Sequence, residues 1–173
     1  MNSWDDARRV VLSLGSNLGQ RMDNLQGALD SLFDARGLRF VAASPVYETA
    51  PVGGPEQGPY LNAIVVADTL LGPQTLLERA QSVEEAFERV RDVRWGPRTL
   101  DVDIIVYGDE VSDDPDLTLP HPHAHERAFV LRPWADVDPE ARIPGRGSVR
   151  DLLTAVRHQE VHRRDDLVLQ VPD

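Results

Sequence analysis

Two aspartates separated by one residue have a spacing that could bind a metal ion. Asp101 and Asp103 begin the apolar run DVDIIVYG. On a strand, alternate side chains share a face, so both carboxylates would lie together with Val102 on the other side. Carboxylates this close repel each other unless a cation lies between them, and such oxygen ligands suit Mg²⁺. The pair therefore predicts a magnesium site; the alternative is two solvated acids at a strand end.

Four arginines stand just upstream of this pair, in a chain whose formal net charge is −11. They are Arg89, Arg91, Arg94 and Arg98, with Trp95 among them. Arginine forks bind phosphate oxygens in bidentate geometry, and a magnesium ion neutralises the remaining charge. The stretch therefore favours a phosphate ligand and phosphoryl transfer. Capping of a helix C-terminus is the alternative role for one of the first two arginines.

The stretch PHPHAHER places His121, His123 and His125 at alternate positions. A zinc site on one strand face is one interpretation, although a proline interrupts the strand and histidine-rich tracts are often polar loops. A narrower use is that one histidine and Arg127 face a polyphosphate. Phe129 would then offer a flat surface on which a ring can stack.

A second flat surface is predicted beside a loop rich in proline and glycine. Residues 48–60 have too much of both for a helix or a central strand, and loops of this length are often functional. Tyr60 and Asn62 follow on a predicted strand and would share a face. A planar heterocycle could stack on the ring while the amide reads its edge; the alternative is an ordinary half-buried strand.

Four longer blocks, LSLGSNLG, SPVYETAPVGGPEQGPYLNAIV, RWGPRTLDVDI and LTLPHPHAHERAFVLRP, carry a resemblance. In order and spacing they resemble the 6-hydroxymethyl-7,8-dihydropterin pyrophosphokinase family of folate biosynthesis, over about residues 11–139. The resemblance implies transfer of the β and γ phosphates of ATP to the hydroxymethyl oxygen of the dihydropterin, with AMP as the other product. Pro122 and Asp116 stand where some members carry a tyrosine and an arginine near the nucleotide.

The resemblance also implies a role for individual residues. Asp101 and Asp103 would hold two Mg²⁺ ions that bridge the triphosphate, while Arg89 and Arg98 would close on the phosphates as catalytic residues. The implied pterin-binding residues are Thr49, Val52, Tyr60, Asn62, Trp95 and Phe129. The implied ATP-binding residues are Gln81, Glu84, Arg91, Ile104, Thr118, His121 and Arg127.

The apolar pattern predicts the elements that must position these residues. Strands are expected over residues 10–14, 38–47, 60–69 and 101–107; the first ends in a Gly-Ser-Asn turn, the second breaks near Pro45, and a Gly-Asp hairpin turn follows the last. Helices are expected over 23–37, 73–90, 128–135 and 148–158, with Ser148 as the last N-cap and a final strand over 167–171. The order β-α-β-β-α-β predicts an α+β sandwich of the ferredoxin-like kind, two helices on one face of an antiparallel sheet.

Length and composition limit the remaining choices. A chain of 173 residues with 41% hydrophobic content fits one globular domain, 1–173, with helical and strand additions at its C-terminal end. It has no cysteine, which excludes thiolate nucleophiles and cysteine zinc sites. It has no lysine either, which excludes a Schiff base and the lysine of a phosphate-binding P-loop.

The expected surroundings of the protein follow from its charge and its apolar runs. The runs are far shorter than the roughly 20 residues of a membrane span, and the N-terminal acids do not suit a signal peptide. The net charge repels nucleic acid. We therefore expect a cytoplasmic monomer that acts on small molecules, with no nucleic-acid or membrane partner.

Two other functions remain open from the sequence. A magnesium-dependent nucleotidyltransferase also combines Gly-Ser with Asp-x-Asp, but here Gly15 and Asp101 are far apart in the sequence. A ferredoxin-like ligand-binding module without catalysis would bind a small molecule and not turn it over. The reaction products distinguish the three.

Overall fold

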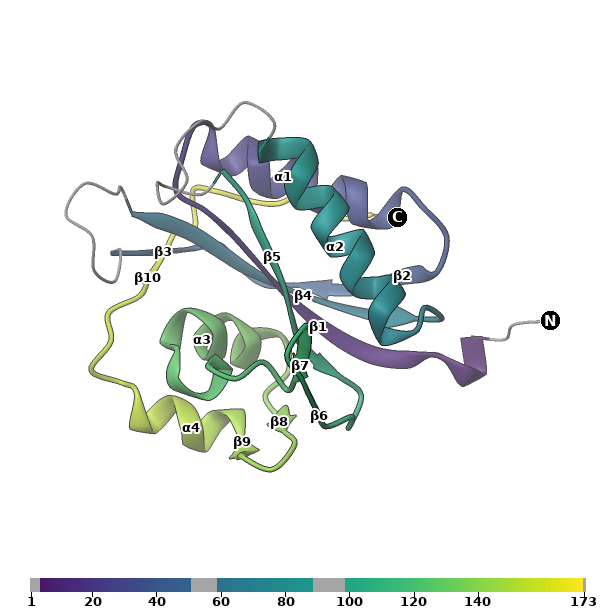
Figure 1. Ribbon diagram of the computed structural model, residues 1–173. Coiled ribbons are helices and arrows are strands. Elements are labelled where there is room, and N and C mark those ends of the chain that lie inside the picture. Colours follow the sequence, from purple (N-terminus) through teal and green to yellow (C-terminus); the bar gives the residue numbers. More distant parts are fainter. Residues whose placement is uncertain (1–3, 51–58, 89–98, 173) are drawn as a thin grey trace.

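The computed structural model describes residues 4–50, 59–88 and 99–172 of the chain. These residues form a central sheet with helices packed on it. The central sheet has six strands within that part of the chain, and helices cover both of its faces (Figure 1). Its strands are β1 (Arg8–Ser16), β2 (Leu38–Ala43), β3 (Tyr47–Thr49), β4 (Tyr60–Thr69), β5 (Asp101–Tyr107) and β10 (His162–Arg163). Their order is β10-β3-β4-β1-β5, with β2 also paired to β4, and every pairing is antiparallel.

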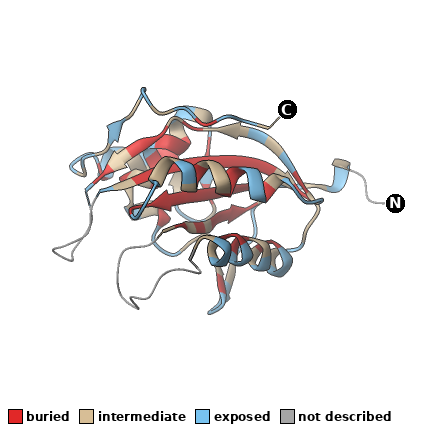
Figure 2. Cartoon of the chain, turned by 90° about the horizontal axis from the view of Figure 1, so that it is seen from above, coloured by how far each residue is buried: buried red, intermediate tan, exposed pale blue. Residues whose placement is uncertain are grey.

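Alternation along the strands divides the core into two layers. In β1, Val10, Leu12 and Leu14 belong to the apolar cluster under α1 and α2, whereas Val11 belongs to the cluster under α3 and α4. Each fully buried side chain of this size contributes roughly 1.5–3 kcal/mol. The helices are α1 (Arg21–Phe33), α2 (Pro73–Glu88), α3 (Ala128–Val137) and α4 (Val149–Ala155). Figure 2 shows the strands buried between helices whose outer surfaces are exposed.

The ferredoxin-like prediction is confirmed. The elements β1, α1, β2 with β3, β4, α2 and β5 follow the predicted order, and α1 and α2 lie on one face of the sheet (Figure 1). β2 and β3 pair with successive parts of β4 and are separated at Ser44 and Pro45, where the sequence predicts a break. The Ser44 hydroxyl accepts a hydrogen bond from the Ile64 amide at 2.8 Å, which ties the break to β4.

The first strand is longer than predicted. Gly15 and Ser16 were expected in a turn, but they continue β1, where Gly15 pairs with Asn62 on one side and Asp101 on the other. A Cβ at Gly15 would lie 3.1 Å from the Asn62 side-chain oxygen. Glycine suits this position of the strand because residues of β4 approach it closely.

Two further predictions are wrong in detail. Glu48 and Thr49 were assigned to a loop, but they belong to β3, because the start of β4 offers them a partner. The turn at Gly108, with φ of 53°, ends β5 without forming a hairpin on it. The next strand, β6 (Ser112–Asp114), pairs instead with β7 (Leu117–Leu119). The remaining short elements are η1 (Trp4–Asp6), η2 (Ala124–Glu126), β8 (Arg142–Ile143) and β9 (Gly147–Ser148).

The predicted helices are present. α1 begins two residues earlier than expected, α2 begins at Pro73 as expected, and α3 continues to Val137. The Ser148 hydroxyl accepts a hydrogen bond from the Asp151 amide at 3.1 Å, which confirms the predicted N-cap of α4. No helix in the three described segments is long and apolar enough to cross a membrane.

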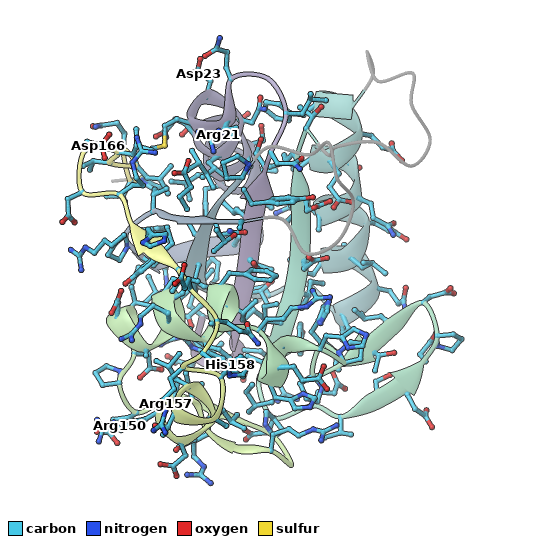
Figure 3. The ribbon with its side chains drawn as sticks, turned by 90° about the vertical axis from the view of Figure 1, so that its left-hand side faces the viewer. Arg21, Asp23, Arg150, Arg157, His158 and Asp166 are labelled. Atoms are coloured by element: carbon cyan, nitrogen blue, oxygen red, sulfur yellow. The ribbon has the colours of Figure 1, made fainter. Side chains whose placement is uncertain are left out.

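The C-terminal segment does not form the predicted final strand. After α4 it runs from the His158 end of the molecule to Asp166 near the start of α1 (Figure 3). Residues 167–171 then lie against α1, where the main chain of Gln170 exchanges two hydrogen bonds with the Gln26 amide, at 2.8 and 2.9 Å. A side-chain amide therefore takes the place of a neighbouring strand, while Leu169 is buried.

Candidate active site

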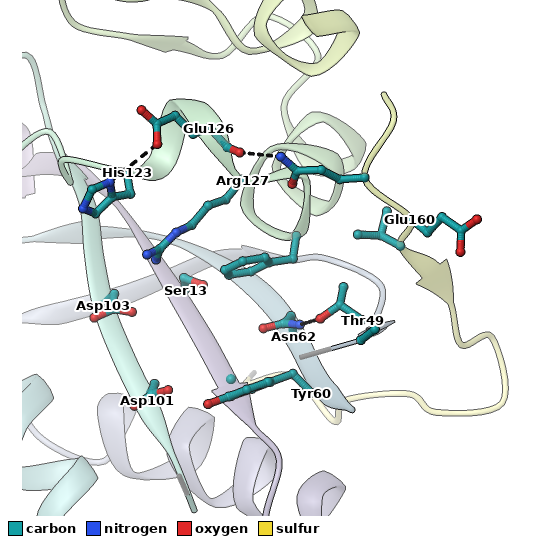
Figure 4. Close-up of a pocket in the computed structure, with 15 residues that line it drawn as sticks. Ser13, Thr49, Tyr60, Asn62, Asp101, Asp103, His123, Glu126, Arg127 and Glu160 are labelled. Atoms are coloured by element: carbon teal, nitrogen blue, oxygen red, sulfur yellow. Dashed lines mark hydrogen bonds and ion pairs between the residues drawn. The ribbon is translucent and has the colours of Figure 1, made fainter. Parts of the chain in front are cut away.

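A pocket of about 710 Å³ opens on the sheet face that carries α3 and α4 (Figure 4). Four strands (β1, β3, β4 and β5), the η2 turn with the start of α3, and the C-terminal segment surround it. Its lining residues are Ser13, Gly15, Thr49, Ala50, Tyr60, Asn62, Asp101, Asp103, His123, Glu126, Arg127, Phe129, Gln159, Glu160 and Val161. Residues from six separate parts of the sequence therefore meet at one site.

The floor of the pocket follows from strand alternation. Asp101 and Asp103 both line it, while Val102 between them is buried on the opposite face. The cross-strand partner of Asp103 is Ser13, and that of Asp101 is Gly15. Because these partners are small, the space beside the two carboxylates is left open.

The magnesium prediction is compatible with this floor. In the described part of the chain, no three histidine and acidic side chains are grouped so that they could hold a metal ion by themselves. Two carboxylates on one face would thus leave the other ligand positions to water and phosphate oxygens, which is how Mg²⁺ is usually held. The same finding gives the zinc interpretation of His121, His123 and His125 no support.

Glu84 supports the carboxylate pair from behind. It lies on α2, on the other face of the sheet, and its side chain accepts a hydrogen bond from the Val102 amide at 2.8 Å. That amide lies between Asp101 and Asp103 in the chain. Glu84 thus fixes the start of β5, and its position favours support of the site over direct contact with a ligand in the pocket.

Four of the predicted pterin-binding residues meet at the other end of the pocket. They are Thr49, Tyr60, Asn62 and Phe129. Asn62 is only 3% exposed, and its amide nitrogen donates to the Thr49 hydroxyl at 2.9 Å. A buried, oriented amide of this kind can distinguish the donors and acceptors on the edge of a heterocycle. Tyr60 comes from the sheet and Phe129 from α3, so aromatic rings are supplied by two different walls.

Arg127 and Phe129 form one cationic and aromatic unit. The guanidinium carbon of Arg127 lies 5.6 Å from the centroid of the Phe129 ring. Figure 4 shows Arg127 extending from the start of α3 toward Ser13 and Asp103. A positive charge therefore lies on the same side of the pocket as the two carboxylates, where a magnesium-bound phosphate would need it.

His121 and His123 lie differently with respect to the pocket. His121 does not line the pocket, and its amide donates to the Ile105 carbonyl at 2.9 Å. Burial lowers the pKa of the His121 ring, although the nearby Asp103 carboxylate opposes this, and the Arg127 and His123 charges lower it further. His123 lines the pocket instead, 3.6 Å from the Glu126 carboxylate (Figure 4).

Other predicted ATP-binding residues lie away from the pocket. The Ile104 side chain is 5% exposed and belongs to the core under α1 and α2, because it alternates with the aspartates, so only its main chain could reach a ligand. Gln81 is exposed on α2, and the Thr118 hydroxyl on β7 bonds the Asp114 carbonyl at 3.1 Å. Five further predicted residues fall outside the described segments: Val52, Arg89, Arg91, Trp95 and Arg98.

Several residues that line the pocket were not predicted from the sequence. Ser13 and Gly15 could have been found, because they alternate with the apolar residues of β1 as Asp101 and Asp103 do in β5. Gln159, Glu160 and Val161 have no such signal. They reach the pocket only because the C-terminal segment crosses the molecule to pair with β3.

The fold and the pocket define a ferredoxin-like α+β protein with an acidic pair and aromatic walls on the sheet face opposite α1 and α2. The family model for 7,8-dihydro-6-hydroxymethylpterin-pyrophosphokinase matches residues 11–139. The chain belongs to this family, which confirms the resemblance and the extent given to it from the sequence blocks.

Individual relatives agree with the family match. A Pseudomonas aeruginosa protein named 2-amino-4-hydroxy-6-hydroxymethyldihydropteridine pyrophosphokinase is 42% identical over 156 residues, 90% of this chain and 96% of that protein. A protein of the same name from Mycobacterium tuberculosis is 46% identical over 174 residues, covering 95% of this chain and 90% of its own length.

A solved structure supports the fold. The crystal structure of wild-type Plasmodium falciparum HPPK-DHPS matches with a TM-score of 0.69 and 15% identity over 87% of this chain. The chain spans 43% of that longer protein. At this level of identity, the match bears on the architecture and not on individual site residues.

Proposed function

We infer that the chain is a 2-amino-4-hydroxy-6-hydroxymethyldihydropteridine pyrophosphokinase. It transfers pyrophosphate from ATP to the hydroxymethyl group of 6-hydroxymethyl-7,8-dihydropterin, with release of AMP, in folate biosynthesis. One observation carries this proposal: Asp101 and Asp103 share a single pocket with Tyr60, Asn62 and Phe129. Family membership and the names of the relatives support it.

The pterin end of the pocket binds and orients the acceptor. Tyr60 and Phe129 hold the ring system by stacking, which contributes about 0.5–1.5 kcal/mol for each aromatic contact beyond the area it buries. Asn62, held by Thr49, reads the polar edge of the ring. Binding in one orientation presents the hydroxymethyl oxygen to the carboxylate end of the same pocket, which converts the reaction into an effectively intramolecular one.

The carboxylate end of the pocket holds the polyphosphate. Asp101 and Asp103 would hold Mg²⁺, because both carboxylates line one face and Ser13 and Gly15 leave space beside them; the family resemblance implies two ions. Bound Mg²⁺ neutralises phosphate charge and assists attack by the hydroxyl group. Arg127 adds a positive charge at this end of the pocket, and Glu84 keeps the start of β5 in place.

The remaining roles come from the family resemblance. Arg89 and Arg98 close on the phosphates, Trp95 seals the site and Val52 contacts the pterin. The nucleotide is bound or supported by Arg91, Gln81, Thr118, His121 and the main chain of Ile104. The enzyme acts on its two small substrates as a cytoplasmic monomer of one domain, 1–173, without nucleic acid or membrane.

The products of the reaction test this function against its two alternatives. The protein is mixed with ATP, Mg²⁺ and 6-hydroxymethyl-7,8-dihydropterin, and the nucleotides are separated. Free AMP in amounts equal to the pterin consumed is expected. Inorganic pyrophosphate with an adenylated pterin would indicate a nucleotidyltransferase, which sequence distance does not exclude, because Gly15 and Asp101 are cross-strand partners. Pterin binding without any nucleotide product would indicate a binding module.

A further inference from the structure

The C-terminal segment supplies one side chain that holds the start of α3. The Oε1 atom of Gln159 accepts a hydrogen bond from the Ala128 amide at 2.9 Å. Its Nε2 atom donates to the Glu126 carbonyl at 2.7 Å. These two peptide groups lie on either side of Arg127, so a single side chain fixes the main chain of that residue from both directions.

The start of α3 needs such a partner. The first amides of a helix have no acceptor within the helix and are usually satisfied by the side chain of the N-cap residue. Arg127 is the N-cap of α3 and makes no such hydrogen bond. Its side chain extends into the pocket, and Gln159, from 31 residues further along the chain, provides an acceptor for the first amide of the helix, that of Ala128.

Gln159 is itself held from two sides. Its own amide donates to the Val156 carbonyl at the end of α4, at 2.9 Å. Just beyond it, His162 and Arg163 of β10 pair with β3, and the Arg164 amide donates to the Val46 carbonyl at 2.8 Å. The segment thus joins the wall of the pocket formed by β3, which carries Thr49, to the wall formed by α3.

We propose that Gln159 is a positioning residue of this enzyme, which sets the direction of Arg127 and Phe129 toward the substrates. The proposal rests on the proposed function, because it takes Arg127 as a phosphate contact and Phe129 as a pterin contact. The two residues flank Ala128, whose amide Gln159 binds. Rotation of the Arg127 peptides would move the guanidinium and the aromatic ring together, and both substrates would bind less tightly.

The test compares variants of Gln159 in the full-length protein. Gln159→Met has nearly the same length and loses both hydrogen bonds, whereas Gln159→Glu keeps the acceptor for the Ala128 amide and loses the donor to the Glu126 carbonyl. Gln74→Met is the matched control, because Gln74 is exposed on α2, on the opposite face of the sheet. Phe129→Ala serves as the reference for loss of a pterin contact.

We expect Gln159→Met to raise the KM for both the pterin and ATP about tenfold, because loss of the two hydrogen bonds would lower the fraction of molecules in which the start of α3 has the binding-competent conformation. Its kcat should change much less, and Gln159→Glu should lie between Gln159→Met and the unchanged protein. A purely structural role would instead lower the unfolding temperature and the active fraction while both KM values stay normal. That outcome, or KM values for Gln159→Met equal to those of Gln74→Met, would overturn the proposal.

The reference variant separates this proposal from the proposed function. If Phe129→Ala weakens pterin binding while Gln159→Met does not, the pterin site is correct and only the positioning role is wrong. If the unchanged protein releases no AMP, the proposed function itself fails. Pterin fluorescence then still reports whether Gln159→Met weakens binding at the pocket.

Discussion

At the scale of single residues, Asp101 and Asp103 differ from the other acids of the chain in what lies beside them. Most of its 29 acidic residues contribute to a negative, solvated surface. These two line a pocket, with Gly15 and Ser13 as their cross-strand partners. A cation between the carboxylates would relieve their mutual repulsion. Their position in the pocket therefore suits the binding of a ligand.

This difference gives a prediction for Asp101→Ala. We expect AMP release to fall about a thousandfold, because loss of a metal ligand removes several kcal/mol of transition-state stabilisation. The free energy of unfolding should change by less than about 1 kcal/mol, since Asp101 is only partly buried and its loss removes a like-charge neighbour of Asp103. Product analysis and urea unfolding measure the two quantities.

Asp113→Ala is the matched control for this prediction. Asp113 is also a strand aspartate, but it is exposed on β6 and does not line the pocket. Its replacement should leave AMP release unchanged. Comparable activity in the two variants would refute the metal-binding role of Asp101.

At the scale of elements, the contact between α1 and α2 depends on a glycine. Gly27 lies in the middle of α1, where helix propensity favours alanine by about 1 kcal/mol. A Cβ at this position would lie 2.4 Å from Cζ and 2.9 Å from Cε1 of the Phe87 ring on α2. The ring is partly buried against the core and would have to move outward. Packing therefore opposes propensity at this position.

We predict that packing wins and that Gly27→Ala lowers the free energy of unfolding by about 1–2 kcal/mol, since overpacking costs about 1–3 kcal/mol. Ser31→Ala is exposed on the same helix and gains propensity without a new contact, so it should be stabilising by a few tenths of a kcal/mol. In a double-mutant cycle, Phe87→Leu should remove most of the cost of Gly27→Ala. Additive effects would contradict the proposed clash.

The elements that the sequence predicts well are those with strong local signals. The start of α2 at Pro73 follows from the preference of proline for the first helical position, and β4 follows from its β-branched run. The predictions for residues 48–49 and 167–171 were wrong for the same reason: an extended segment forms a strand only where another part of the chain offers it a partner. β4 is such a partner for Thr49, whereas Gln170 is bonded by the Gln26 side chain and not by a strand.

The same division holds for the pocket. Alternation along a strand is a local pattern, so the sequence predicts that Asp101 lies beside Asp103 and that Tyr60 lies beside Asn62. That the two pairs face one cavity depends on strand order, which the fold class predicts. Gln159 could not be predicted, because its role comes from the path of the C-terminal segment and not from any pattern around it.

At the scale of the whole molecule, one hydrogen bond links the sheet to the layer that covers the pocket. The Tyr47 hydroxyl on β3 donates to the Asp136 carboxylate near the end of α3. Tyr47 is 5% exposed. The bond joins the far end of α3 to the strand that carries Thr49, while Gln159 holds the near end through Ala128. α3 is thus fixed against the sheet at both of its ends.

The pKa of Tyr47 makes this link measurable by pH. Burial, the hydrogen bond to Asp136 and the negative charge of that residue together raise the pKa of the Tyr47 hydroxyl to about 12, although the charges of Arg132 and Arg163 partly oppose the shift. In the unfolded chain a tyrosine titrates near pH 10. The stabilisation from the protonated hydroxyl is therefore complete below about pH 10 and is lost as the pH rises toward about 12.

Tyr47→Phe should accordingly have an effect that depends on pH. Near neutral pH, we expect the free energy of unfolding to fall by about 1–2 kcal/mol, because a hydrogen bond to a charged acceptor is lost. The difference in the free energy of unfolding between the two proteins should shrink between about pH 10 and about pH 12. In this range the hydroxyl ionises in the unfolded chain but stays protonated in the folded one, which lowers the stability of the unchanged protein only. Urea unfolding across this range measures both curves, and comparison of the two proteins cancels the titration of the other tyrosines. A difference that stays constant from neutral pH to about pH 11 would show that the Tyr47 hydroxyl does not hold α3 against the sheet through its proton.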